Sequence, residues 1–156
     1  MSSSSDARDG ETSELEILSA RTFDAPRERV FEAFSDPARL ARWWGPKGFT
    51  NTFQEFDPRP GGTWRFLMHG PGGADIPNES VFVEVVRPER IVFRHVSGHR
   101  FEMTITLAEQ GGRTRVTWRM RHETARECAE VRPFVVDANE QNFDRLAEEL
   151  ARMASG

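Results

Sequence analysis

The stretch FEMTITLAEQGGRTRVTWRMRH, residues 101–122, contains two runs of alternating apolar and polar side chains on either side of two glycines. A period of two is typical of a β-strand with one buried face. The apolar positions are odd-numbered before Gly111-Gly112 and even-numbered after it, so the loop needs an even number of residues. A two-residue glycine turn meets that need and predicts an antiparallel hairpin. The predicted inner pairs are Phe101 with His122, Met103 with Met120, and Ile105 with Trp118.

The preceding segment is also predicted to be a strand, with Phe93 and His95 on its inner face. The inner residues have odd numbers both in this strand and in the strand that starts near Phe101, so the loop between them needs an odd number of residues. A three-residue loop at 97–99 pairs His95 with Phe101. The row His95, Phe101 and His122 is therefore expected to cross three strands at one end of the inner surface.

The same alternation predicts seven strands in all, joined to three helices. Two short helices are expected after the first strand, one beginning with Asp24 as an acidic cap before Pro26 and one ended by Gly45-Pro46. A long terminal helix is expected to open at Pro133, with an apolar face formed by Val136, Asn139, Phe143, Leu146 and Leu150. The predicted strands are Glu16–Phe23, Phe49–Phe56, Thr63–His69, Ser80–Val86, Arg90–Val96, Arg100–Leu107 and Thr114–His122.

The fold class that follows is α+β, a seven-stranded, curved antiparallel sheet wrapped around the C-terminal helix, because only that helix is long enough to cover the sheet. Residues 1–13 lack a hydrophobic period and are predicted to form a disordered tail, followed by a single domain over residues 14–154. The lone Cys128 excludes an intramolecular disulfide.

Charge and composition exclude several partners. A net charge of −4 without a basic patch argues against nucleic acid. The chain has neither an apolar run of about 20 residues nor a basic leader, so we expect no membrane partner and a cytoplasmic protein.

A curved sheet around a helix leaves a space between them, which predicts a small-molecule site lined by inner side chains. Ordinary core packing remains the alternative interpretation. The fourth strand is expected to add Val81, Val83 and Val85 to the inner surface. The candidate ligand-binding residues are Trp44, Trp64, Phe66, Met68, Phe93, His95, Phe101, Met103, Trp118, Met120, His122, Asn139 and Phe143.

The two inner histidines have three interpretations: metal ligands, polar anchors for a ligand, or rim residues in contact with water. Their backbones are expected roughly 10 Å apart, with Phe101 between them, which is wide for one zinc ion. No cysteine or carboxylate cluster completes a coordination shell. We therefore predict no metal and no cofactor, and the roles of anchor and rim residue remain open.

No catalytic motif is present: the chain lacks a G-x-S-x-G elbow, an H-E-x-x-H pair, a P-loop and a dinucleotide fingerprint. Whether the protein is an enzyme therefore stays open.

The stretch RWWGPKGF, residues 42–49, raises a separate question because it has two adjacent tryptophans. On a helix end Trp43 and Trp44 point about 100° apart, so only one is expected to face the cavity. We interpret the stretch as a hydrophobic plug that gates the cavity and has no chemistry of its own.

Three stretches carry a resemblance to a known family: FDAPRERVFEAFSDPARLARWWGPKGFTNTFQEFDPRPGGTWRF, then ESVFVEVVRPERIVFRH, and finally NFDRLAEEL. The run from Phe23 to Leu150 resembles the SRPBCC, or START-like, superfamily, in the branch similar to the activator of the heat-shock-protein-ninety ATPase. The resemblance implies the helix-grip fold and a cavity that, in different members, binds lipids, hormones or polyketides or supports cyclase or hydrolase chemistry. Relatives commonly have Gly-Trp where this chain has Ala138-Asn139, which should enlarge the cavity here.

Three functions are compatible with these features. The first is binding of a small apolar molecule, with His95, His122 and Asn139 as hydrogen-bonding groups. The second is a cyclase- or hydrolase-type enzyme that uses His95 or His122 as a general base. The third is a co-chaperone-like interaction domain, which would need an exposed apolar patch. A homodimer is a further possible assembly.

Overall fold

The computed structural model describes residues 13–155, so the expected tail lies outside the described residues except for Ser13. Ten elements follow one another along the chain. They are β1 (Glu16–Phe23), α2 (Arg27–Ser35), α3 (Pro37–Trp43), β2 (Thr50–Phe56), β3 (Thr63–His69), β4 (Asp75–Val86), β5 (Arg90–His95), β6 (Phe101–Gln110), β7 (Arg113–His122) and α4 (Ala125–Ser155).

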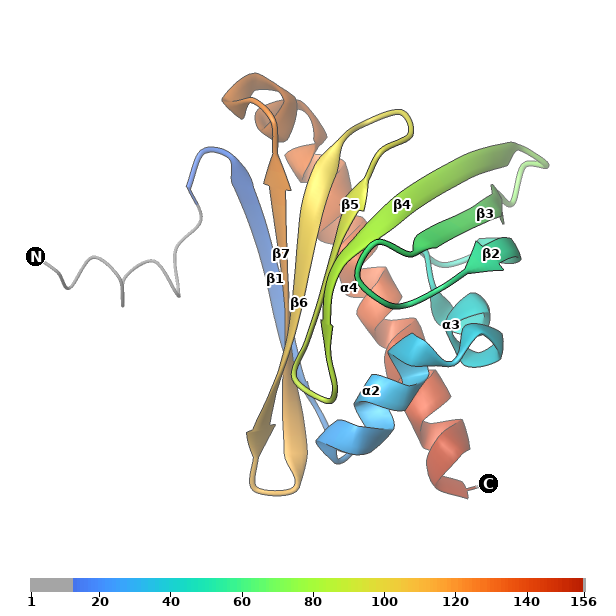
Figure 1. The fold of residues 1–156 in the computed structure, drawn as a ribbon, viewed down its shortest axis with the longest axis vertical. Coiled ribbons are helices and arrows are strands. Elements are labelled where there is room, and N and C mark those ends of the chain that lie inside the picture. The colour runs from blue at the N-terminus through green and yellow to red at the C-terminus, as the bar shows by residue number, and fades with distance from the viewer. Residues whose placement is uncertain (1–12, 156) are drawn as a thin grey trace, which may run out of the picture.

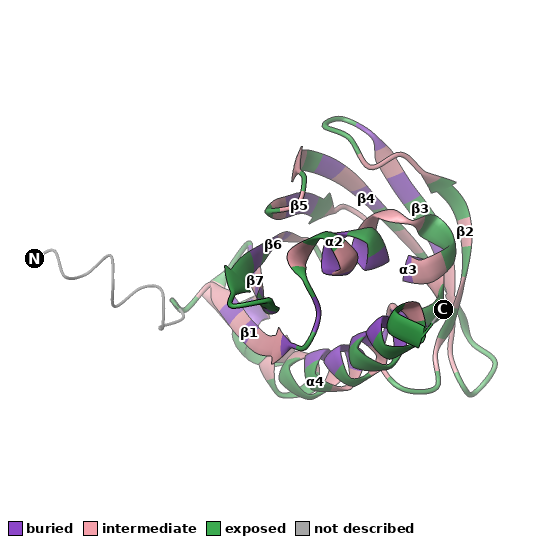
Figure 2. Ribbon diagram, turned by 90° about the horizontal axis from the view of Figure 1, so that it is seen from below, coloured by how far each residue is buried: buried purple, intermediate pink, exposed green. Residues whose placement is uncertain are grey.

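The seven strands form one antiparallel sheet in the order β1-β7-β6-β5-β4-β3-β2. The sheet curves around α4, and α2 and α3 lie against its lower part (Figure 1). Seen from below, the strands follow an arc from β1 to β2, and α4 spans the gap between the ends of the arc (Figure 2). This is the helix-grip fold, and it confirms the predicted fold class.

The predicted register of the central strands is confirmed. Phe101 pairs with His122 across β6 and β7, and His95 pairs with Phe101 across β5 and β6. The turn between β6 and β7 consists of Gly111 and Gly112, at φ 59° and 85°, in the left-handed region that glycine enters most easily.

The prediction that Val81, Val83 and Val85 form the inner face of β4 is wrong in part. Ser80 and Phe82 face the core and are 1% and 3% exposed, whereas Val83 is 36% exposed. A bulge between Phe82 and Glu84 then inserts one residue, and Val85 packs against the core. An extra residue reverses the alternation of a strand, and the valine-rich sequence gives no sign of where this happens.

One expected helix start and one expected helix cap are also wrong. Helix α4 begins at Ala125, not at Pro133, which lies inside the helix. The Thr124 hydroxyl accepts a hydrogen bond from the backbone N–H of Glu127 at 3.1 Å, so threonine caps the first turn. Helix α2 begins after Pro26, and Asp24 does not cap it because no side chain caps this helix.

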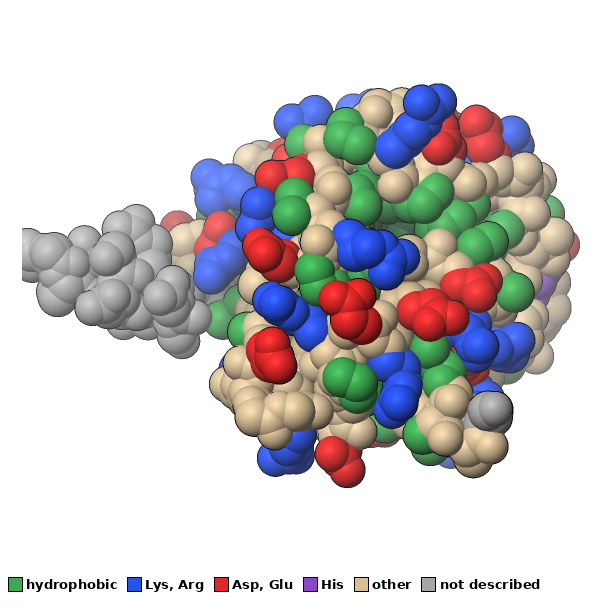
Figure 3. Space-filling view, turned by 60° about the horizontal axis from the view of Figure 1, so that its bottom comes forward, with side chains coloured by type: hydrophobic (Ala, Val, Ile, Leu, Met, Phe, Trp, Pro, Cys, Tyr) green, Lys and Arg blue, Asp and Glu red, His purple; other side chains and the backbone are tan. Residues whose placement is uncertain are grey.

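The buried face of α4 follows the expected spacing from its middle to its end, with Phe143, Leu146 and Leu150 against the sheet. Val136, which was expected on this face, is 42% exposed. On the side of the molecule shown in Figure 3, basic and acidic side chains are interspersed around a few apolar ones. None of the helices within residues 13–155 has the length and apolarity needed to cross a membrane.

Candidate functional site

A cavity of about 220 Å³ lies between the inner face of the sheet and α4. Its walls come from β3 to β7, from the loop after α3 and from the middle of α4. The lining residues are Trp44, Gly45, Pro46, Trp64, Phe66, Met68, Asn78, Ser80, Phe93, His95, Phe101, Met103, Trp118, Met120, Ala138, Asn139 and Asn142.

All of the predicted site residues line this cavity except His122 and Phe143. Phe143 is fully buried, and its ring lies 4.7 Å from that of Trp118, so it supports the cavity wall from behind. His122 belongs to a separate groove at the end of the sheet. The sequence did not indicate Asn78, Ser80 or Asn142, because the bulge in β4 and the exact rotation of α4 decide which of these side chains face inward.

The two tryptophans of residues 42–49 have different roles. Trp43 is fully buried, and its indole N–H donates to the carbonyl of Ala33 at 3.0 Å. Trp44 is only partly buried and lines the cavity, with its ring centroid 5.1 Å from Trp64 and 5.3 Å from Trp118. Trp43 is therefore part of the core, and Trp44 is the cavity-facing residue.

The backbone of this loop is held by Arg145 of α4, a contact that the sequence did not indicate. Its guanidinium donates to the carbonyls of Arg42 at 2.7 Å, Gly45 at 2.9 Å and Pro46 at 3.0 Å. Gly45 has a φ of 102°, which lets the chain turn so that these carbonyls converge on one side chain. A planar guanidinium suits this task because its donors spread in a fixed fork.

Polar groups in the cavity are few and mostly engaged with the protein. The Asn139 amide donates to the Ser19 hydroxyl at 3.1 Å, and the Asn142 amide donates to the Trp43 carbonyl at 2.8 Å. His95 lies between two oxygens: its Nδ1 is 2.7 Å from the carbonyl of His99, and its Nε2 is 2.8 Å from the amide oxygen of Asn78.

A neutral imidazole can donate only one hydrogen bond, whereas an imidazolium could donate to both of these oxygens. Burial opposes the charged form and lowers the pKa of His95, and the hydrogen bond to the carbonyl of His99 acts in the opposite direction. His95 is therefore a half-buried polar group at the end of the cavity, with a protein oxygen next to each ring nitrogen.

His99 extends this polar end and was missed at the sequence level, because it lies in a loop outside the alternating pattern. Its Nε2 is 2.7 Å from Nδ1 of His122. Burial, with smaller contributions from His99 and Arg132, lowers the pKa of His122 to about 4. His122 is 3% exposed, so it is a buried neutral histidine and not a rim residue in contact with water.

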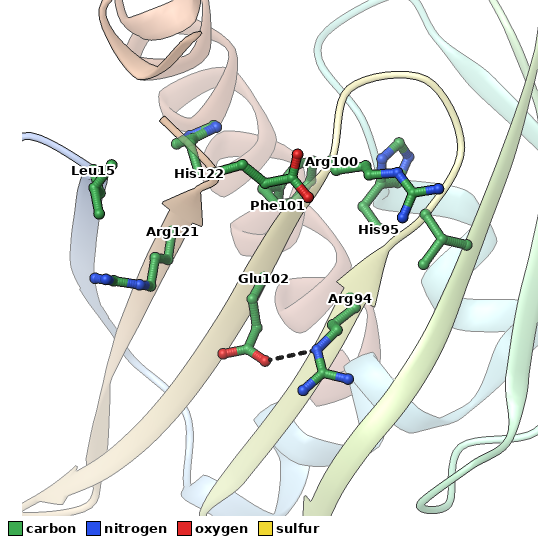
Figure 4. Close-up of a pocket in the computed structure, with 10 residues that line it drawn as sticks. Leu15, Arg94, His95, Arg100, Phe101, Glu102, Arg121 and His122 are labelled. Carbon is green, nitrogen blue, oxygen red and sulfur yellow. Dashed lines mark hydrogen bonds and ion pairs between the residues drawn. The ribbon is translucent and has the colours of Figure 1, made fainter. Parts of the chain in front are cut away.

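The groove that contains His122 has a volume of about 510 Å³ and lies at the end of β5, β6 and β7. Arg94 and Arg121 come from the outer face of the sheet, and Arg94 pairs with Glu102 at 3.2 Å (Figure 4). His95 and Phe101 line both the groove and the inner cavity. Their stacked rings, 4.9 Å apart, therefore lie between the two spaces.

A second hydrogen-bonded chain, on β2, β3 and β4, joins Thr52, His69 and Asp75. The His69 ring is 2.7 Å from the Thr52 hydroxyl through Nε2 and 2.7 Å from the Asp75 carboxylate through Nδ1. This order of groups resembles a hydroxyl, base and acid relay. However, the Asp75 side chain is 62% exposed, so these three hydrogen-bonded residues are in contact with solvent. They lack the water-excluded surroundings that such chemistry needs.

Glu149 is the most buried carboxylate near the loop, with a side chain 0% exposed. It accepts hydrogen bonds from Arg42 of α3 and from Arg152 of α4, both at 2.7 Å. Glu149 therefore ties the two helices together beside the Trp44 loop. Within residues 13–155, no three His, Cys, Asp or Glu side chains are placed to hold a metal ion together.

The sheet, the gripping arrangement around α4 and the cavity between them define a START-like helix-grip domain. The family model for the Activator of Hsp90 ATPase homolog 1-like proteins matches residues 24–151. The chain belongs to this family, which is part of the SRPBCC superfamily.

Solved structures of several bacterial proteins have the same fold. A Nitrosomonas europaea protein is 22% identical, with a TM-score of 0.84 over 92% of this chain and 98% of that one. A Chromobacterium violaceum protein is 28% identical, with a TM-score of 0.75 over 85% and 95% of the two chains. A family member from Silicibacter pomeroyi is 21% identical, with a TM-score of 0.75 over 88% and 99%. No curated protein sequence matches the chain significantly.

Proposed function

We propose that the protein binds a small apolar molecule in the cavity between the sheet and α4. The observation that carries the proposal is a space of about 220 Å³ bounded mainly by aromatic rings and methionines. Protein interiors are usually packed without voids much larger than a water molecule, so a partly open cavity of this size that reaches into the core suits an occupant. Typical sites for drug-sized molecules span roughly 300–1,000 Å³, so this occupant is smaller than those molecules.

The composition of the wall supports the same proposal. Met68, Met103 and Met120 can adapt their flexible side chains to a ligand without large cost. The residues that line the cavity include no arginine, lysine or carboxylate, so an ion inside it would lose its hydration without gaining a partner.

An enzyme that uses His95 as a base is the second candidate, because His95 lines the cavity and its pKa is lowered. Both of its ring nitrogens lie within 2.8 Å of a protein oxygen, so the Asn78 side chain would have to move before a substrate could reach Nε2. An interaction surface of the co-chaperone kind has little support. Within residues 13–155 four large apolar side chains are exposed, Ile76, Val83, Phe134 and Val136, and of these only Phe134 on α4 is more than half exposed, at 76%. Binding without chemistry therefore has the strongest support.

The test uses indane, an apolar bicyclic hydrocarbon, and protein labelled at the methionine methyl groups. We expect indane to shift the NMR signals of Met68, Met103 and Met120, which line the cavity, and to leave Met153 near the end of α4 unchanged. At a ligand concentration of about 100 times Kd, the free energy of unfolding should rise by about 2.7 kcal/mol.

Ala138→Phe places a ring at the cavity wall and should abolish these shifts, whereas Ala129→Phe, at an exposed position of the same helix, should not. If saturating indane shifts none of the three inner methyl groups in the wild-type protein, or if Ala138→Phe binds as the wild type does, the cavity is not the binding site.

A further inference from the structure

Two hydrogen-bond donors in the cavity wall lack an acceptor. The indole N–H groups of Trp64 and Trp118 are buried, and neither has a partner among the described residues. The two side chains are 2% and 1% exposed. Buried indole N–H groups normally find an acceptor, as the N–H of Trp43 does at the carbonyl of Ala33.

Both indoles line the same cavity, so a molecule in that cavity would lie beside the two residues that carry the unpaired donors. The amide N–H groups of Asn139 and Asn142, in the same cavity wall, donate to Ser19 and to the Trp43 carbonyl, and no described group accepts from either indole. An indole N–H can only donate, so the missing partner must be an acceptor.

The ring of Trp44 packs against both indoles. Its centroid is 5.1 Å from Trp64 at an interplanar angle of 62° and 5.3 Å from Trp118 at 44°. Trp44 also borders a narrow apolar cleft of about 10 Å³ on its other side, where Phe34, Leu40, Phe56, Val85 and Ile91 are among the lining residues. Trp44, Trp64 and Phe93 line both spaces, so moving the Trp44 ring would join the cleft to the cavity.

The backbone of Trp44 is held while its side chain is not fully enclosed. The Trp44 carbonyl accepts from the Asn51 amide at 2.9 Å and from Arg145 at 3.3 Å. Arg145 also donates to the carbonyls of Gly45 and Pro46. Because these hydrogen bonds hold the backbone, we assign the opening of this wall to rotation of the Trp44 side chain.

We propose that the occupant of the cavity is a small aromatic molecule with a neutral carbonyl acceptor, which displaces the Trp44 ring and accepts hydrogen bonds from the N–H groups of Trp64 and Trp118. The aromatic walls suit an aromatic guest through offset and edge-to-face contacts. A carboxylate is disfavoured because no cationic side chain lines the cavity. This inference rests on the proposed function and names the ligand class for the same cavity.

The test compares indane with 1-indanone, which has the same ring skeleton and one ketone oxygen. Spectra of the ¹⁵N-labelled protein resolve the four indole N–H signals of the chain, which are assigned by Trp→Phe substitution at each position in turn. We expect 1-indanone to move the Trp64 and Trp118 signals downfield and to leave Trp43 unchanged, since Trp43 already has its partner. Indane should produce no downfield shift of the Trp64 and Trp118 signals, and 1-indanone should bind about tenfold tighter than indane.

Trp44→Leu tests whether the Trp44 ring limits entry of the ligand. Removing the indole ring should accelerate association of 1-indanone and preserve its preference over indane, and Trp44→Phe should give an intermediate rate. Equal affinities for indane and 1-indanone in the wild-type protein, with no movement of the Trp64 and Trp118 signals, would overturn the inference while leaving the proposed function in place. If neither compound binds the cavity, both proposals fail.

Discussion

Replacing Glu149 with glutamine removes the negative charge that joins α3 to α4. Burial alone would raise the pKa of Glu149, but hydrogen bonds from Arg42 and Arg152 outweigh this and lower it from 4.5 to about 2. A carboxylate with a lower pKa in the folded protein stabilises the fold at pH values above its unfolded pKa. That stabilisation disappears as the pH falls from about 4.5 toward 2.

The size of the effect follows from the shift. Each pKa unit corresponds to about 1.4 kcal/mol, so the full shift is equivalent to about 3 kcal/mol. Arg42 and Arg152 are 50% and 55% exposed, so solvent screens part of their interaction. We therefore expect Glu149→Gln to lower the free energy of unfolding by about 2 kcal/mol at pH 7.

Urea unfolding followed by tryptophan fluorescence at pH 7, 5 and 3 measures this effect. The difference between wild type and Glu149→Gln should be nearly constant from pH 7 to 5 and clearly smaller at pH 3. Glu148→Gln, at the exposed neighbouring position, is the control and should stay within about 0.5 kcal/mol of wild type. A difference that does not depend on pH, or a loss at pH 7 no larger than that of the control, would refute the reasoning.

Three further outcomes are expected. Lysine cannot reproduce the fork of hydrogen bonds from Arg145 to the loop carbonyls, so Arg145→Lys should lower the free energy of unfolding in urea by about 1–2 kcal/mol. An unchanged unfolding midpoint would show that these hydrogen bonds do not stabilise the fold. Because the pKa of His122 is lowered to about 4, the unfolded chain binds a proton first, so stability should fall between pH 6.5 and 4. His122→Gln should flatten that slope, and an NMR titration that shows His122 charged at pH 6 would argue against it. The bulge in β4 predicts that Val83→Asp changes stability by about 0.5 kcal/mol or less and Val85→Asp by more than about 2, and the reverse order would place the bulge elsewhere.

The strands were predictable because alternation and loop parity act locally. Once Gly111-Gly112 was taken as a two-residue turn, the pairs of β6 and β7 followed, including the row of His95, Phe101 and His122. Val81 and Val83 were misplaced because valine fits either face of a strand, so nothing in the alternation reports an inserted residue. Pro133 was misread because proline in a helix is more often at its start than in its interior.

The candidate site was predictable as a set of inner side chains but not as a set of contacts. Trp44 could not be separated from Trp43 until the end of α3 and the turn at Gly45 were placed. Arg145 and His99 were not found, because each acts through contacts that depend on packing or loop geometry and neither belongs to a motif. The prediction of no metal and no cofactor, like that of the ligand itself, remains to be tested by experiment.

The position of α4 at the end of the described chain constrains how the domain is made in the cell. The first strand pairs with the last, as Glu16 with Arg121 shows, so the sheet cannot be completed until β7 has been synthesised. The aromatic inner face then stays uncovered until the 31 residues of α4 have followed. Because chains emerge from the ribosome N-terminus first, this domain folds late in its own synthesis and presents an apolar, unclosed sheet until then. A stalled or truncated product that ends before α4 should therefore aggregate and be degraded.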